Sequence, residues 1–172
     1  KNTIRSHKYQ YQSTPPYELI SNKDLSAEDV DYLKKFADIF DRFYNSKRFR
    51  FSIVHLLQKM DPVTLFDRLL HHHESNNLFM NPVALDTQYE IFQQTFFTNP
   101  SSEEKDLLKL DYLYSQRAYR LPAFLSEKSI FSGKTWKQDR KTPIISFQHK
   151  IEISGSKAHL KSMEHPVYYA IS

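Results

Sequence analysis

The sequence predicts a mainly α-helical fold, with about five helices in a bundle-like array and a small antiparallel β element towards the C-terminal end. Five segments repeat apolar residues at helical spacing, and most of them follow a residue type that starts helices. Strict alternation of apolar and polar residues over 144–154 predicts one long strand. An α+β fold is the alternative.

The first 25 residues are expected to form an extended lead-in. Pro15 and Pro16 fix their φ angles near about −65°, and Pro15 disfavours helical geometry at Thr14. Such a segment can lie against another surface without being a helix or a strand. The chain is accordingly divided into a lead-in, a helical domain and a β-containing extension packed on that domain, over residues 1–25, 26–125 and 126–172.

The first helix is predicted to begin at Ala27. Ser26 and Asp29 form the Ser-x-x-Asp pattern of a capping box, in which each side chain bonds the backbone N–H of the other residue. Two neighbouring apolar stripes then run as far as Tyr44, which implies a wide buried face. Charged pairs four residues apart contribute only about 0.2–0.5 kcal/mol each, so packing of the apolar face must hold this helix.

Four further helices are predicted before residue 120. The segment FSIVHLLQKM is the first of them, and an Asp-Pro pair at 61–62 starts the next, VTLFDRLLHHH. An Asn-Pro pair at 81–82 repeats that signal for VALDTQYEIFQQTFF. Ser101 and Glu104 form a second capping box, before DLLKLDYLY.

The β element is predicted to be an antiparallel pair. In the strand at 144–154, Ile145 and Phe147 share one face, and polar residues occupy the other. A second β-prone run covers 165–172, and residues 155–164 are long enough to return the chain beside the first strand.

The composition excludes several classes of site. With two isolated glycines there is no glycine-rich phosphate loop, and with no cysteine there is no disulfide, thiolate zinc site or cysteine-held iron–sulfur cluster within these residues. No apolar run reaches about 18 residues and the N-terminal residues lack a signal-peptide core, so a cytoplasmic location without membrane contact is expected. The net charge of +4 is spread along the chain, which makes nucleic acid an unlikely partner.

No catalytic, cofactor-binding or metal-binding residue is predicted. The histidines at 71–73 are adjacent on a helix, so their side chains point about 100° apart and make a poor chelate. The paired acids lie at helix ends, where capping explains them better than acid–base chemistry. Trp136, between two lysines, is the one aromatic suspected of facing outward, with interdomain packing as its favoured use.

Three stretches resemble a known family. PPYELISNKDLS at 15–26, FYNSKRF at 43–49 and LLKLDYLYSQRAYRLPAFL at 107–125 are similar to the C-terminal, DUF4080-type region of cobalamin-binding radical SAM proteins. The resemblance spans about residues 11–125. The chain departs from the family pattern at 19–20, where Leu-Ile replaces Val-Leu.

The resemblance implies a larger parent enzyme. Its upstream parts would be a Rossmann-like cobalamin domain and a partial barrel whose cysteines hold a [4Fe–4S] cluster that cleaves S-adenosylmethionine. Neither motif occurs in this chain, which is therefore expected to be a non-catalytic C-terminal accessory domain whose partners are those upstream domains. The absence of an initiator methionine agrees with this expectation. The domain would cover the active site, orient the substrate or mediate assembly.

The alternative is a free-standing helical module that binds nucleic acid or protein. A basic face beside Trp136 favours nucleic acid, and an exposed apolar patch around Pro16 and Tyr17 favours an intramolecular partner. The motif positions that are candidates for an interface or for facing substrate are Pro16, Tyr17, Glu18, Tyr44, Asn45, Arg48, Asp111 and Tyr112. Structural roles compete with four of these assignments: Tyr44 continues an apolar stripe, Asn45 can end a helix, and Asp111 and Tyr112 can bond across helices.

Overall fold

The computed structural model describes residues 6–116, 121–126, 144–154 and 157–170. Within them lie five α-helices, of which the first continues into a π-helix, η1. A short antiparallel hairpin precedes the helices and a longer one follows them. The elements are β1 (Gln10–Tyr11), β2 (Leu19–Ser21), α2 (Ala27–Phe40), η1 (Asp41–Asn45), α3 (Arg50–Leu56), α4 (Pro62–Ser75), α5 (Leu85–Phe96), α6 (Ser102–Gln116), β3 (Ile144–Ser154) and β4 (Lys157–Ala170). The predicted mainly α fold with a C-terminal antiparallel β element is confirmed.

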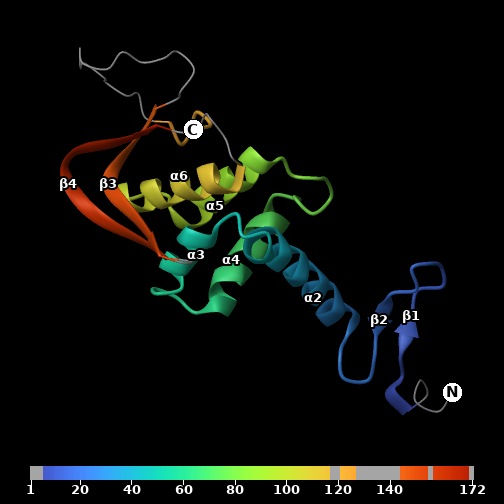
Figure 1. Cartoon of the computed structure of the whole chain (residues 1–172). Helices are drawn as coiled ribbons and strands as arrows, with labels where there is room; N and C mark the ends of the chain where they lie inside the picture. Colours follow the sequence, from blue (N-terminus) through green and yellow to red (C-terminus); the bar gives the residue numbers. More distant parts are fainter. Residues whose placement is uncertain (1–5, 117–120, 127–143, 155–156, 171–172) are drawn as a thin grey trace.

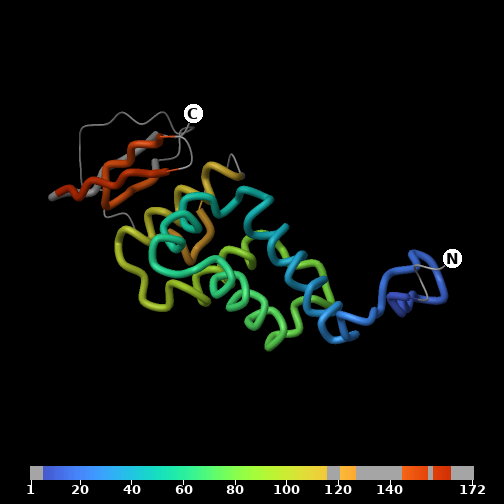
Figure 2. The backbone as a smooth tube through the Cα atoms, turned by 90° about the horizontal axis from the view of Figure 1, so that it is seen from below, coloured from blue at the N-terminus to red at the C-terminus, as the bar shows by residue number. Residues whose placement is uncertain are grey.

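The two hairpins lie at opposite ends of the molecule (Figures 1 and 2). Helices α3 to α6 form the body, and α2 leads from it to the β1–β2 hairpin, which projects away from the helices. We call residues 6–21 the N-terminal arm. At the other end, β3 packs against α6, and β4 contacts α3.

The core of the body is largely aromatic. Phe49 lies with its ring centroid 4.3 Å from that of Tyr89, 4.7 Å from Phe92 and 5.0 Å from Phe43, and all four side chains are fully buried. Because these residues come from η1, the segment before α3, and α5, their packing joins three parts of the chain.

Three of the four predicted helix starts are confirmed. The side chains of Ser26 and Asp29 form the capping box at α2, and the Asp61 carboxylate accepts the Thr64 N–H at α4. At α6, Ser101 Oγ accepts the N–H of Glu104, whose carboxylate accepts the N–H of Ser101. The helix start predicted from the Asn-Pro pair at 81–82 is wrong.

Helix α5 begins only at Leu85, after an extended Ala84 whose side chain makes no capping bond. A local start signal is weak against tertiary packing. The buried residues of α5 lie between Gln88 and Phe92, so the helix forms where its side chains pack into the core.

Two other predictions are corrected. The lead-in was expected to lack strands, but β1 pairs with β2 on either side of a turn that contains the cis Pro15–Pro16 peptide bond. At the C-terminal end, β4 begins at Lys157 and not near residue 165, so residues 155–156 alone separate the paired strands. The register of that hairpin shifts between Phe147 and His149, where residues 163–166 of β4 lie opposite the single residue 148 of β3.

Helix α2 is buried over a narrower face than its two apolar stripes predict. Val30 and Ile39 are buried, whereas Tyr32 and Leu33 remain 39% and 49% exposed. The first half of α2 therefore presents apolar surface to the outside. In the part of the chain that the structure describes, no helix has both the length and the apolar character required to cross a membrane.

Candidate functional site

The first family motif forms the turn of the N-terminal arm. Pro16, Tyr17 and Glu18 are all exposed, and the Tyr17 N–H donates to the Thr14 carbonyl over 3.0 Å. Tyr17 has a left-handed backbone, with φ of 54°. The Glu18 carboxylate pairs with Lys34 of α2, so this turn is tied to the helix that follows.

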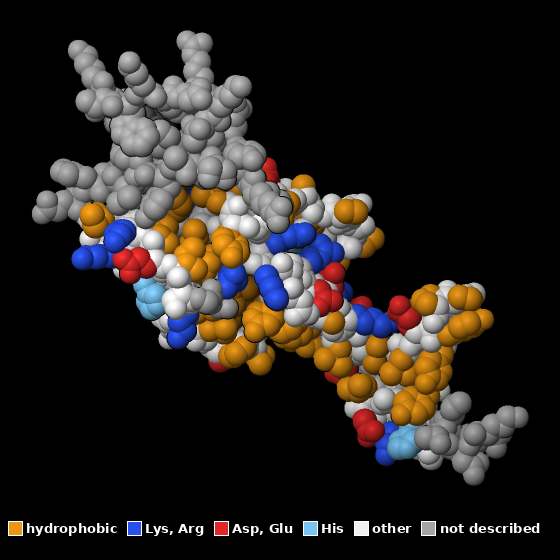
Figure 3. All heavy atoms as spheres, viewed as in Figure 1, with side chains coloured by type: hydrophobic (Ala, Val, Ile, Leu, Met, Phe, Trp, Pro, Cys, Tyr) orange, Lys and Arg blue, Asp and Glu red, His pale blue; other side chains and the backbone are white. Residues whose placement is uncertain are grey.

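An exposed apolar surface covers the arm and the start of α2. We call it the arm surface and define it by Tyr11, Tyr17, Ile20 and Leu33, whose exposed fractions range from 39% to 60%. Figure 3 shows hydrophobic side chains gathered on the arm and continuing towards the helical body. Strand β2 contacts α2, which holds the two parts of the surface next to each other.

The second motif, at 43–49, alternates between core and surface. Phe43 and Phe49 are buried in the aromatic core, and Tyr44, Asn45 and Lys47 between them are exposed. Tyr44 is 48% exposed and packs its ring against Phe40, with centroids 4.8 Å apart. Asn45 donates from its side-chain amide to Asp41 one turn earlier. Two buried aromatics thus anchor an exposed turn.

This turn borders a groove of about 320 Å³, which we call the η1 groove. Two cationic side chains, Lys47 and Arg50, line it, and Lys47 has a left-handed backbone with φ of 59°. The full lining is Phe43, Tyr44, Asn45, Lys47, Arg50, Ile53 and Val54. Of the motif positions that are candidates, Tyr44 and Asn45 line this groove.

Arg48 does not line the groove. Its backbone carbonyl accepts a hydrogen bond from the Tyr89 hydroxyl over 2.9 Å, and the same hydroxyl lies 2.8 Å from Ser115 Oγ. Burial raises the pKa of Tyr89 well above its usual range, so this phenol stays neutral. The bond fastens the turn that follows η1 to α5 and α6.

Asp111 and Tyr112 lie on α6 and bond to other helices. The buried Asp111 carboxylate accepts the backbone N–H groups of Phe51 and Ser52, over 2.9 and 2.8 Å, and so caps the start of α3. The Tyr112 hydroxyl donates to the Asp86 carboxylate of α5 over 2.8 Å. Burial, followed by that hydrogen bond, raises the pKa of Tyr112 to about 12. Both side chains join helices, and neither lines the η1 groove.

Two further buried polar residues of α6 escaped the sequence reasoning. Asp106 Oδ2 accepts the N–H groups of Gln148 and His149, over 2.7 and 2.9 Å, and also lies 2.9 Å from His149 Nδ1. Lys109 donates to the Ser146 carbonyl over 3.3 Å, and its Nζ lies 3.6 Å from Asp106 Oδ1. These contacts hold β3 at the position of the register shift. The sequence feature that could have indicated them is the position of Asp106 and Lys109 directly beside Leu107 and Leu108, which are buried.

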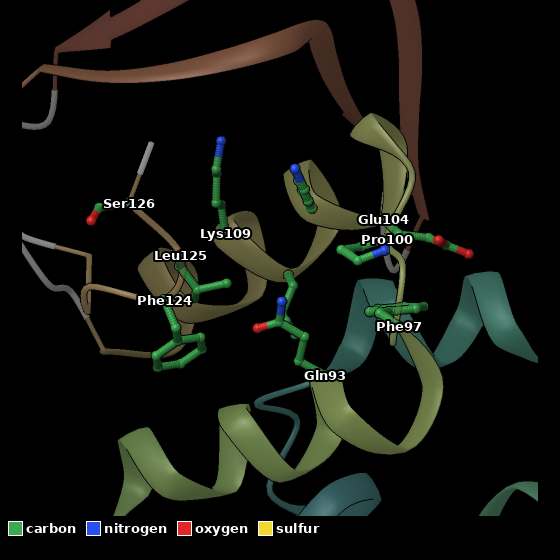
Figure 4. A pocket seen from close by; sticks show the side chains of 10 residues that line it. Gln93, Phe97, Pro100, Glu104, Lys109, Phe124, Leu125 and Ser126 are labelled. Carbon is green, nitrogen blue, oxygen red and sulfur yellow. The ribbon is translucent and has the colours of Figure 1, made fainter. Parts of the chain in front are cut away.

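A second pocket, of about 230 Å³, lies between α5, α6 and residues 124–126 (Figure 4). Its charged side chains already have structural partners. Glu104 caps α6 and accepts from Lys59, and Lys109 extends from α6 towards β3. We therefore assign this pocket no chemistry.

The three histidines differ in their surroundings. His73 is buried, with Nδ1 2.7 Å from the Leu69 carbonyl and its ring edge against Phe43, and burial lowers its pKa. His71 is exposed and lies near Asp67. The described residues hold no group of three or more potential metal ligands. Trp136 and its neighbouring lysines lie outside the described residues.

The cap made by Asp111 predicts a pH dependence. Burial raises the pKa of this carboxyl from 3.8 to about 7, against the hydrogen bonds from Phe51 and Ser52, which lower it. Between those values the native state holds a proton that the unfolded state has released, so the free energy of unfolding falls as the pH rises from about 4 to about 7. One such group contributes a slope of at most about 1.4 kcal/mol per pH unit.

Urea denaturation of wild type and Asp111→Asn from pH 4 to pH 8 measures this slope. Asp111→Asn is expected to remove it. Asp61→Asn is the matched control, because hydrogen bonds from Thr64 hold the pKa of Asp61 below 3.8 and its pH-dependent contribution therefore lies below the tested range. This substitution is expected to leave the slope between pH 4 and pH 8 unchanged. Parallel pH profiles for wild type and Asp111→Asn would contradict the assignment.

The chain matches a known protein family. A family model described as "Protein of unknown function (DUF4080)" matches residues 5–164. No curated protein and no solved structure matches the chain significantly.

Proposed function

Because this chain belongs to the DUF4080 family, we propose that it is a non-catalytic accessory domain of a larger radical enzyme, docked onto its upstream domains by the N-terminal arm. In this proposal the parent uses a [4Fe–4S] cluster, S-adenosylmethionine and cobalamin, as the resemblance described above implies. The domain covers the active site, orients the substrate or mediates assembly. A cytoplasmic location belongs to the same proposal.

The arm surface is the observation that carries the docking part. Tyr17 is 60% exposed at the tip of a hairpin that projects from the body. Burying apolar surface stabilises a protein by about 25 cal/mol per Å², so a partner that covers this side chain would gain binding free energy. Apolar side chains gathered on one projecting element mark an interaction site more often than isolated ones do. The exposed ion pair between Glu18 and Lys34 and the contacts of β2 with α2 link this surface to the helical body.

The charges on α2 favour this proposal over a nucleic-acid surface. Each of three cations on this helix and η1 has an acidic partner: Lys34 pairs with Glu18, Lys35 with Asp31 and Glu74, and Arg42 with Asp38. A helix that tracks phosphates presents its cations on one face without such neutralisation. The 172 residues contain no cysteine, so the cluster of the proposed parent is bound upstream.

The test compares hydrogen–deuterium exchange in this chain and in the complete polypeptide encoded by its gene. We expect slower exchange at Tyr11, at residues 17–21 and at the start of α2 in the complete polypeptide. The double substitution Tyr17→Ser with Ile20→Ser is expected to remove at least half of that protection, while the stability of the isolated chain changes by less than about 0.5 kcal/mol.

Val63→Ser is the control, because Val63 is also well exposed but lies on α4. Equal exchange of the arm in both proteins would exclude docking. An upstream coding sequence without the three-cysteine cluster motif would exclude the radical-enzyme part and leave the docking result standing.

A further inference from the structure

The η1 groove combines positive charge with an apolar floor. Lys47 and Arg50 are the charged residues of its lining, and the Arg50 charge also acts on the nearby Asp111 carboxyl, whose pKa burial raises and this charge lowers. The nearest acid on η1, Asp41, accepts a hydrogen bond from Asn45. Phe43, Ile53 and Val54 supply the apolar part of the lining. A ligand that matches these walls has an anionic group and an apolar body.

Two of the groove's side chains, those of Arg50 and Tyr44, are held by their surroundings. The Arg50 guanidinium lies 4.9 Å from the ring centroid of Phe51 and 5.3 Å from that of Tyr114, which restricts its motion. The Tyr44 ring packs against Phe40 and edge-on against Phe66. Side chains fixed before binding lose less entropy when a ligand arrives.

The backbone that shapes the groove is irregular at two consecutive places. Five residues adopt a π-helix in place of continuing α2, and Lys47 then takes a left-handed conformation. Such π-helical turns occur often at functional sites, and a lysine with positive φ is uncommon. Together they place Tyr44, Asn45 and Lys47 on the groove wall.

From this combination we infer that the η1 groove binds a small organic anion, a carboxylate or a phosphate monoester, with its charged group between Lys47 and Arg50 and its apolar part on Ile53 and Val54. A volume of about 320 Å³ suits a small molecule. The inference does not depend on docking, because η1 and the arm lie at opposite ends of α2.

The test is a titration of the isotope-labelled chain with phenyl phosphate, phenylacetate and neutral benzyl alcohol, followed by amide chemical shifts. Both anions are expected to shift the amides of Tyr44, Lys47 and Val54 saturably, and benzyl alcohol is not. The anion that binds more tightly identifies the preferred charged group.

Lys47→Asn and Arg50→Gln are each expected to weaken anion binding about tenfold, the loss of one charge-assisted hydrogen bond. Asn is chosen at position 47 because it tolerates the left-handed backbone. Lys23→Asn, a change of the same charge on the exposed Lys23 that precedes α2, is the control and is expected to change nothing.

Three results would overturn the inference. The first is an absence of saturable shifts with either anion, and the second is an equal response to benzyl alcohol. The third is a single-stranded oligonucleotide that binds more tightly than phenyl phosphate and shifts amides well beyond the groove, which would indicate a nucleic-acid surface. Arm variants are expected to leave anion binding unchanged, so this test and the docking test fail independently.

Discussion

Asp106→Ala is expected to lower the free energy of unfolding by about 3–5 kcal/mol. The substitution removes a fully buried carboxylate that accepts the N–H groups of Gln148 and His149 and faces Lys109. It leaves the buried Lys109 charge without that carboxylate and two backbone donors without their acceptor. Uncompensated buried charge is among the few causes of losses this large.

Chemical denaturation measures the loss, and hydrogen exchange locates it. In the variant, the amides of Gln148 and His149 are expected to exchange faster than those of α4, because the β3–β4 hairpin loses its anchor first. Glu152→Ala is the control on the same hairpin. Glu152 pairs with Lys150 on the exposed surface, where an ion pair contributes about 0–1 kcal/mol. Equal losses for the two variants would show that Asp106 does not hold the hairpin.

Phe92→Ala is expected to cost about 3–5 kcal/mol by leaving a cavity in the aromatic core. Phe92 is fully buried, and its ring stacks on Phe49 and lies within 6.2 Å of Phe43, Phe96 and Phe97. Because close-packed cores relax only in part around a missing ring, both the transfer free energy and the cavity contribute.

Two further variants distinguish the cost of the cavity from the cost of removing any phenylalanine ring. Phe92→Leu fills part of the space and is expected to cost less than half as much as Phe92→Ala. Phe96→Ala makes the same chemical change at a half-buried position on α5 and is expected to cost less than Phe92→Ala. Urea unfolding of all three gives the order, and a Phe96→Ala loss as large as that of Phe92→Ala would contradict it.

The features that the sequence predicts well are local ones. The capping boxes at Ser26 and Ser101 involve residues three apart, so their geometry follows from the pattern alone. The predicted start of α5 was wrong because the packing of Tyr89 and Phe92 outweighs the local preference of the Asn-Pro pair. The N-terminal hairpin was missed because strands of two and three residues show no periodicity.

The candidate site was predicted only in part, for a related reason. The family motif pointed to Tyr44 and Asn45, which line the η1 groove, and also to Arg48, which does not. Lys47 and Arg50 were not among the candidates because Lys47 lies in the turn after η1 and Arg50 is the first residue of α3, so no single helical period relates them to Tyr44. The bonds made by the two buried aspartates are also long-range. Asp106 bonds to Gln148, 42 positions away, and Asp111 bonds to Phe51, 60 positions away, and no local sequence pattern specifies such partners.

The spacing of the two buried aspartates on α6 has a consequence for how this chain can vary. One carboxylate secures the C-terminal hairpin and the other secures α3, whose first residue lines the groove. A single residue inserted between them would turn one attachment point by about 100° relative to the other, so the helix could keep hold of one neighbour but not both. We therefore expect the spacing between positions 106 and 111 to tolerate insertions and deletions far less than the loops that connect the helices.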